Sequence, residues 1–200
     1  MDKPTATFLG LLFAGFLSVA QAAEPETVIT FDSAQIGKPV PTWTAKAVVF
    51  ELASAPVRSQ AVGRVMFFPH LGSGKTGPDK IGILNAMAEE QAIPVQAYFP
   101  MGASSVTVSF WASTGCPALL EAFDKDGNLL DKASVDSAPS RKSPAEMEPN
   151  FELTVKGAAI AYVHFSGPRR GDFLAAEQVR FTPLPATAPS PAPTAAAATK

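Results

Sequence analysis

The chain has 200 residues, of which 16 are Lys or Arg and 18 are Asp or Glu, so its formal net charge is −2. This near-neutral balance gives no electrostatic basis for binding nucleic acid or an anionic membrane surface, and we expect neither partner. Cys116 is the single cysteine, which excludes an intrachain disulfide, so the hydrophobic core has to hold the fold. We expect Cys116 itself to be buried as a small hydrophobic side chain.

Residues 1–23 have the order of a secretory signal peptide. Lys3 precedes an apolar run over residues 8–19, and the small-x-small sequence Ala20-Gln21-Ala22 follows it. The run is shorter than the roughly 20 apolar residues that a membrane span needs; the alternative is an uncleaved N-terminal anchor. We therefore expect an exported protein, secreted or held in the periplasm or cell envelope, with no membrane contact after signal cleavage.

Between residues 24 and 183 the sequence pattern is typical of β-strands. In residues 104–111, Val106, Val108 and Phe110 alternate with Ser and Thr, which is the period of a half-buried strand. Only residues 85–91 have a composition that suits a helix, for one or two turns. In chain order the expected strands are 27–31, 47–52, 62–68, 94–99, 104–111, 118–123, 129–135, 151–155, 159–165 and 174–181.

The connections between these strands indicate the fold class. Asp126-Gly127, between two apolar runs, predicts a hairpin over residues 124–128, because glycine takes the positive φ that the turn requires. About ten short strands without a β-α-β rhythm predict an all-β fold, an antiparallel β-sandwich or barrel. Two long polar loops, 69–80 and 137–150, are where such a scaffold usually carries function.

The end of the chain differs in composition from the rest. Residues 184–200 consist mostly of Pro, Ala and Thr, which cannot bury a core and favour extended chain. We expect a disordered tail or spacer there. The predicted organisation is a signal peptide over 1–23, one β-sandwich domain over 24–183 and a Pro/Ala-rich tail over 184–200.

Three segments of the chain carry recognisable motifs: the opening Phe31-Asp32 with Gly37, Pro41 and Trp43, the hairpin Ala122 to Leu129, and the closing strands 160–165 and 172–181. Together they resemble the galactose-binding-like jelly roll of secreted bacterial proteins. The match covers most of the folded region. The family includes non-catalytic carbohydrate-binding modules, so the resemblance implies a jelly-roll β-sandwich with a binding role.

The resemblance also implies a metal site, since some members hold a structural calcium between the first and last strands. Asp32 and Glu177 are its candidate ligands in this sequence, because Ca²⁺ binds carboxylates and backbone carbonyls. The usual acidic pair reads Glu177-Gln178, so one of its two carboxylates is missing. The alternative for either residue is a surface acid at a strand end. No other cofactor is expected.

The sequence shows no catalytic constellation. The segment 72–76, Gly-Ser-Gly-Lys-Thr, lacks the first glycine of a phosphate-binding loop, and Gly77-Pro78 prevents the helix that must follow. His70 and His164 have no partners at metal-ligand spacing, and no serine lies in a nucleophile-elbow sequence. We therefore expect no enzymatic activity.

Three residues are candidates for contacting a ligand. Trp43 offers an aromatic surface to a sugar, His70 lies in the first long loop, and Arg141 begins a basic pair, Arg141-Lys142, in the second. Trp43 has core packing as its alternative, since aromatic side chains supply much of the buried area of a small sandwich. A cation at a loop tip also serves solubility alone, which is the alternative for Arg141.

Two functions remain open at this stage. The first is a non-catalytic module that binds a glycan or another cell-surface component. The second is a structural or protein-interaction protein of the cell envelope with no small ligand. A concave face that exposes aromatic and hydrogen-bonding side chains together would favour the first. An apolar patch without converging polar groups would favour the second.

Overall fold

The computed structural model describes residues 25–31, 39–40, 42–53, 65–69, 81–85, 93–112, 114–140, 149–167 and 174–185. Within them all regular secondary structure is β-strand, and every strand pair is antiparallel. The all-β, antiparallel prediction is confirmed for these residues, while the jelly-roll assignment stays a prediction. Residues 1–23 lie outside the described part, as does the tail from residue 186 onward. None of the described segments contains a helix long and apolar enough to span a membrane.

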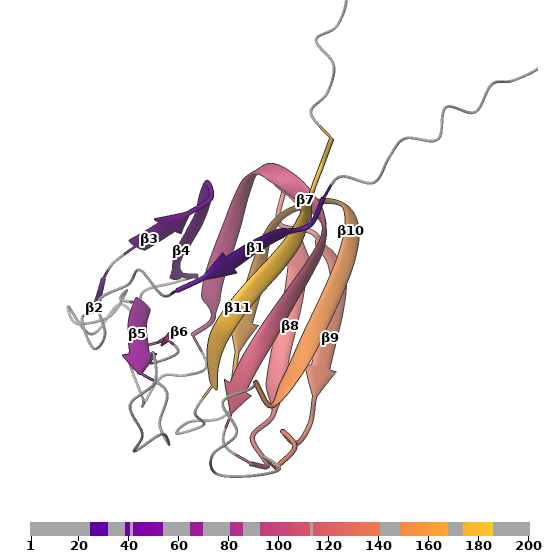
Figure 1. The fold of residues 1–200 in the computed structure, drawn as a ribbon. Coiled ribbons are helices and arrows are strands. Elements are labelled where there is room, and N and C mark those ends of the chain that lie inside the picture. Colours follow the sequence, from indigo (N-terminus) through magenta and orange to yellow (C-terminus); the bar gives the residue numbers. More distant parts are fainter. Residues whose placement is uncertain are drawn as a thin grey trace, which may run out of the picture.

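The strands form one hydrogen-bonded sheet with branches (Figure 1). Its main path runs in the order β2-β5-β6-β11-β7-β10-β8-β9, β1 pairs with β11, and β3 reaches β7 through β4. The strands are β1 (Thr27–Thr30), β2 (Pro39–Val40), β3 (Thr42–Ala45), β4 (Val48–Leu52), β5 (Val65–Pro69), β6 (Ile81–Asn85), β7 (Val95–Ala112), β8 (Ala118–Phe123), β9 (Leu129–Val135), β10 (Phe151–Ser166) and β11 (Leu174–Pro183).

The long strands β7 and β10 each belong to two groups of strands. The first half of β7 pairs with β4 and with the second half of β10, which in turn pairs with β8. The second half of β7 pairs with β11 and with the first half of β10. Figure 1 shows β7 rising, bending over at the top of the view and descending again. We call β4, the first half of β7, the second half of β10 and β8 the first strand group, which β3 and β9 extend. We call the second half of β7, the first half of β10 and β11 the second strand group, which β1 extends.

The bend of β7 depends on glycine. Gly102 has φ +73°, a conformation that side chains with a Cβ rarely adopt. A Cβ at this position would also lie 2.7 Å from Leu184 Cδ1. The corresponding region of β10, between Lys156 and Ile160, is a break in the pairing register with β7. Both strands therefore change direction at the same end of the molecule.

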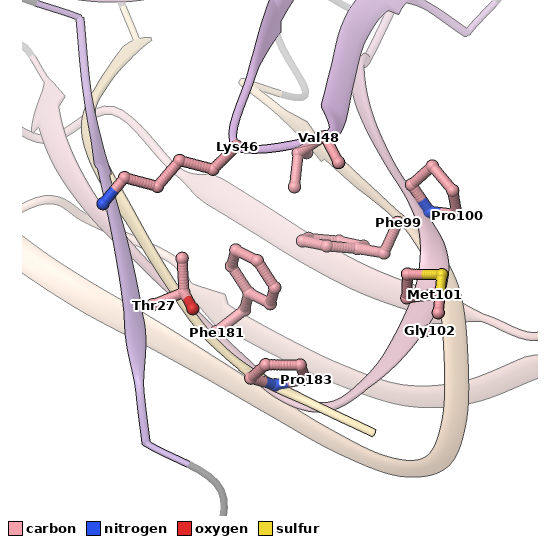
Figure 2. A pocket seen from close by; sticks show the side chains of 10 residues that line it. Thr27, Lys46, Val48, Phe99, Pro100, Met101, Gly102, Phe181 and Pro183 are labelled. Carbon is pink, nitrogen blue, oxygen red and sulfur yellow. The ribbon is translucent and has the colours of Figure 1, made fainter. Parts of the chain in front are cut away.

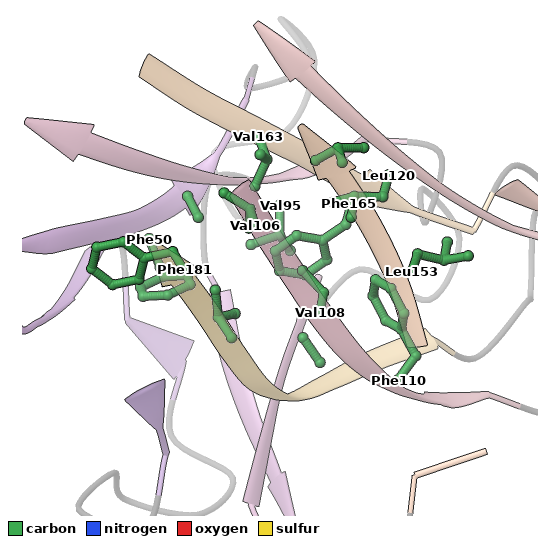
Figure 3. Close-up of a cluster of buried hydrophobic side chains, with 14 of the residues drawn as sticks. Phe50, Val95, Val106, Val108, Phe110, Leu120, Leu153, Val163, Phe165 and Phe181 are labelled. Atoms are coloured by element: carbon green, nitrogen blue, oxygen red, sulfur yellow. The ribbon is translucent and has the colours of Figure 1, made fainter. Parts of the chain in front are cut away.

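The hydrophobic core lies between the two strand groups. Phe99 of the first group meets Phe181 of the second, with ring centroids 5.0 Å apart. Phe110 of the second group meets Phe165 of the first at 5.8 Å. Figure 3 shows Phe181, Phe110 and Phe165 among buried valines and leucines of both groups. Cys116 is buried and belongs to this cluster, which confirms the expectation for it.

The structure joins strands that the sequence pattern separates. The predicted strands 94–99 and 104–111 belong to one strand, β7, which begins at Val95, and the predicted strands 151–155 and 159–165 are both parts of β10. Proline and glycine at positions 100 and 102 indicate a break in the sequence, yet β7 continues across them, with pairing to β10 on both sides of the bend, at Tyr98 and at Ala103. The short strands β2, β3 and β6 were not predicted, and Asn85, the first residue of the expected helix, ends β6.

The predicted hairpin between β8 and β9 is confirmed. Gly127 has φ +84°, as the Asp-Gly pattern requires. The Asp124 Oδ1 atom accepts the backbone N–H groups of Asp126 and Asn128, both at 2.9 Å. Hydrogen bonds from the side chain and backbone of Asn128 hold the pKa of Asp124 below its usual value. A turn with a side chain bonded to its own backbone fixes the register of the two strands that it joins.

Candidate functional site

Three aromatic side chains lie side by side on the outward face of the first strand group. Tyr98 of β7 pairs with Tyr162 of β10, and Tyr162 pairs with Phe123 of β8. Directly opposed residues of antiparallel strands point to the same face, so these three form an aromatic row across the strands. Val49 and Leu129 extend the row at its two ends. At the usual strand spacing the row spans about 10 Å from β7 to β8.

The rings of this row are close and accessible. Phe123 and Tyr162 stack with centroids 5.1 Å apart and an interplanar angle of 14°. The imidazole of His164 lies 4.9 Å from Phe123 and 5.1 Å from Tyr162, also between centroids. Tyr98 is 42 % exposed, which is unusual for a large aromatic side chain on a strand. The aromatic row therefore presents ring surface to solvent rather than to the core.

A second row of side chains, all polar, lies two residues along the same strands, about 7 Å away. In it, His164 Nε2 lies 2.9 Å from Gln96 Oε1, and Gln96 Nε2 donates to Glu51 Oε1 at 3.3 Å. At the other end, Lys132 Nζ lies 3.5 Å from Glu121 Oε1. The polar row, from β4 to β9, consists of Glu51, Gln96, His164, Glu121 and Lys132.

The imidazole of His164 is neutral near pH 7. Burial lowers the pKa of His164 below its ordinary value of 6.5, because the charged form loses hydration. The nearby Glu121 carboxylate acts in the opposite direction and does not outweigh burial. The polar row thus offers hydrogen-bond donors and acceptors with little net charge, beside an aromatic surface.

The outward face of the second strand group has a different character. Thr107 and Thr154 are hydrogen-bonded through their hydroxyl groups at 2.8 Å. Glu152 accepts from Ser109 at 2.7 Å and pairs with Arg180 at 2.5 Å. Most of these polar groups pair with one another across the strands. Among the described residues, the buried Arg180 Nε has no hydrogen-bond partner. Of the two faces, the one with the aromatic row is the better candidate for contacting a ligand.

A pocket of about 260 Å³ opens elsewhere, at the bend of β7. Figure 2 shows Phe99, Phe181 and Pro183 along it, with Met101 at one end and Lys46 extending toward β1 at the other. Met101 is 70 % exposed. The lining is largely apolar, and its polar side chains, Thr27 and Lys46, do not converge on a common point in Figure 2. This pocket is an apolar patch rather than a site for a hydroxyl-rich ligand.

Two of the predicted site residues lie within the described part. Trp43 of β3 packs on the core side, with its ring centroid 5.0 Å from Phe31 and 5.6 Å from Phe50. This position agrees with the core-packing alternative, and Trp43 is not on the face of the aromatic row. Glu177 of β11 sits at a break in the register with β7, and its Oε2 accepts a hydrogen bond from Trp111 Nε1. It lies within a strand rather than at a strand end.

The other predicted site residues, Asp32, His70 and Arg141, lie outside the described residues. The structure therefore does not test whether Asp32 and Glu177 come together around calcium. Among the described residues, no group of three or more His, Cys, Asp or Glu side chains is placed to hold a metal ion. The calcium site and the ligand contacts of His70 and Arg141 stay predictions.

Sequence reasoning missed the face that the structure reveals. Tyr98, Phe123 and Tyr162 are each within or at the end of a predicted strand, and none lies in an aromatic-rich loop. His164 has no partner close to it in sequence. The available signal was the alternation along β10, which places Tyr162 and His164 on one face. Only the strand order brings Tyr98 and Phe123 beside them.

Comparisons with known proteins assign no family to the chain. No family model matches the sequence, and no curated protein matches it. A solved structure described as "BiXyn10A CBM1 APO" is similar at 12% identity and a TM-score of 0.40, over 80% of this chain and 97% of that one. A second is a glycoside hydrolase family 43 arabinoxylan arabinofuranohydrolase from Bacillus subtilis in complex with cellotetraose, at 15% identity and a TM-score of 0.32. The alignment covers 62% of this chain and 26% of that longer one. Because both TM-scores lie below 0.5, neither likeness identifies a ligand or a fold family for this chain.

Proposed function

We propose that this chain is a non-catalytic, exported glycan-binding module with a jelly-roll fold, and that it binds through the aromatic and polar rows. The observation that carries the proposal is their convergence on one face. Sugar rings have apolar C–H faces that pack on aromatic rings, and hydroxyl groups that need hydrogen-bond partners. Binding sites generally combine such apolar contact with a few placed polar groups. Export is supported by the signal-peptide pattern of residues 1–23.

The arrangement of the acids supports a binding role over acid–base chemistry. The Glu51 carboxylate accepts from the Gln96 amide, and the Glu121 carboxylate pairs with the Lys132 ammonium. A catalytic acid needs a free path to the substrate. Both carboxylates are instead engaged by neighbouring side chains. A structural calcium at Asp32 and Glu177 belongs to this proposal as a stabilising element, not as a catalyst.

The apolar pocket at the bend of β7 supports a second candidate function. Met101 is the most exposed of the large hydrophobic side chains in the described part of the chain. Exposed methionine beside a mostly apolar pocket is typical of surfaces that bind other proteins. In this reading the chain is a protein-interaction component of the cell envelope, and the polar and aromatic rows have no ligand.

Binding measurements on single variants distinguish the two functions. The full chain is titrated calorimetrically with cellohexaose, xylohexaose and other neutral oligosaccharides, and the measurement is repeated with Tyr98→Ala and Met101→Ala. The glycan proposal requires binding that Tyr98→Ala weakens and Met101→Ala leaves unchanged. Lys156→Ala, on the outward face of the second strand group, is the matched surface control. Absence of binding to every glycan, with association of a protein partner that only Met101→Ala disrupts, would establish the alternative.

A further inference from the structure

The hydrogen bonds of the polar row fix the direction of each donor. An ionised Glu51 carboxylate can only accept, so the group of Gln96 that faces it at 3.3 Å must be the amide nitrogen. The carbonyl oxygen of Gln96 then faces His164 Nε2 at 2.9 Å. That oxygen also only accepts. The proton of the imidazole must therefore be on Nε2.

A neutral imidazole with its proton on Nε2 has a bare lone pair on Nδ1. Among the described residues, His164 Nδ1 has no hydrogen-bond partner. The imidazole lies between the two rows, since its ring contacts Phe123 and Tyr162 of the aromatic row. An acceptor atom without a protein partner is thus placed next to the surface on which a sugar ring would stack.

The charges around the imidazole determine which ligands suit this acceptor. The polar row carries two carboxylates and one ammonium, −2 + 1 = −1, when the imidazole is neutral. Burial keeps it neutral near pH 7 against the pull of Glu121. The titratable groups that face His164 from the neighbouring strands are Glu51 of β4, Tyr98 of β7, Glu121 of β8, Lys132 of β9 and Tyr162 of β10 itself.

We propose that His164 determines the specificity of the face, by offering Nδ1 as an acceptor to a hydroxyl group of an uncharged saccharide stacked on the aromatic row. The inference rests on the proposed glycan-binding function and names its ligand class. A uronate keeps ring hydroxyl donors, but its carboxylate can only accept and meets a row of net negative charge, which disfavours it against an uncharged saccharide. Protonation of Nδ1 turns the acceptor into a donor, so acidification removes the preference for uncharged saccharides.

The protonation state is testable without any ligand. Two-bond ¹H–¹⁵N correlation spectra of the full chain distinguish the two neutral imidazole forms from the imidazolium. The chain contains only two histidines, so the spectrum of His164→Gln assigns the signals. A proton on Nε2 at pH 7.5 is the expected result. A proton on Nδ1, or an imidazolium at that pH, overturns the inference whatever the protein binds.

The specificity is tested by titrating cellohexaose, xylohexaose and hexagalacturonate at pH 7.5 and at pH 5. For the neutral probe that binds, affinity should fall about three- to tenfold in His164→Phe, the range expected for one lost hydrogen bond. His164→Gln has an amide that can both donate to Gln96 and accept from a hydroxyl, so its affinity should be retained and independent of pH. Wild type should lose affinity for the neutral probe as the pH falls through the folded-state pKa of His164, which the same correlation spectra locate in a pH titration. Neutral-saccharide binding that His164→Phe leaves intact overturns the inference and preserves the proposed function, whereas failure of all probes at both pH values overturns both.

Discussion

Phe123 and Tyr162, which lie on neighbouring strands and are distant in sequence, stack with ring centroids 5.1 Å apart and an angle of 14° between their planes. The β8–β9 turn lies beside this pair, since a Cβ placed at Gly127 would be 3.6 Å from the Tyr162 hydroxyl. The two rings project from paired residues of β8 and β10, so the backbone of both strands positions the stack. Aromatic surface positioned in this way binds at a low cost in conformational entropy.

The first prediction concerns the ring of Tyr162. Tyr162→Leu should weaken oligosaccharide binding about tenfold, roughly 1.4 kcal/mol, since it removes a central aromatic contact and its stack with Phe123. Tyr162→Phe should retain most of the affinity, because it preserves the ring. Isothermal titration calorimetry measures both. Equal affinities for the Leu and Phe variants would show that ring stacking does not contribute to binding.

The second prediction concerns stability against pH. Burial lowers the pKa of His164 in the folded chain, whereas in the unfolded chain it stays near 6.5. Between these two values the unfolded state binds more protons, so the free energy of unfolding falls as the pH falls. The stability that the neutral imidazole contributes is fully present above about pH 6.5. It is lost as the pH drops through the pKa of His164 in the folded chain. Melting temperatures from pH 7.5 to pH 5 should therefore decline more steeply for wild type than for His164→Gln, and parallel declines would contradict this.

The third prediction concerns the core between the two strand groups. Phe110 is fully buried and contacts Phe151 and Phe165 with its ring. Phe110→Ala should reduce the free energy of unfolding by about 3–5 kcal/mol, through lost burial and the cavity left behind. Phe110→Leu should cost clearly less, because it retains most of the volume. Urea denaturation measures both changes, and a cost below about 1 kcal/mol for the alanine variant would place Phe110 outside the core.

The fourth prediction concerns the bend of β7. Gly102→Ala should destabilise the fold for two reasons: its φ of +73°, and a new Cβ 2.7 Å from Leu184 Cδ1. Backbone strain of this kind costs about 1–2 kcal/mol. Adding Leu184→Ala removes the close contact and leaves the strain, so the double variant should recover only part of the loss. Urea denaturation of wild type, the two single variants and the double variant gives a double-mutant cycle, which separates the close contact from the backbone strain. Full recovery would mean that backbone conformation at Gly102 contributes nothing.

Much of the local structure follows from the sequence, because local structure depends on local chemistry. The alternation of Val106, Val108 and Phe110 predicts a half-buried strand, and Asp126-Gly127 predicts the hairpin that the structure contains. The bends of β7 and β10 could not be predicted in the same way. Proline and glycine look like strand ends in sequence, yet β7 continues beyond them, because pairing with β10 resumes at Ala103 on the far side of the bend.

The candidate site is a product of tertiary structure. From the sequence, His164 has no partner, since Gln96 and Glu121 are remote from it along the chain. Antiparallel pairing of β10 with β7 and β8 brings both beside it, and the same pairing aligns Tyr98, Tyr162 and Phe123. The sequence by itself determined most of the strand segments, the main turn and the need for a core without disulfides. The order of the strands alone decided which side chains share a face, because hydrogen bonding between strands, not distance along the chain, sets what lies next to what.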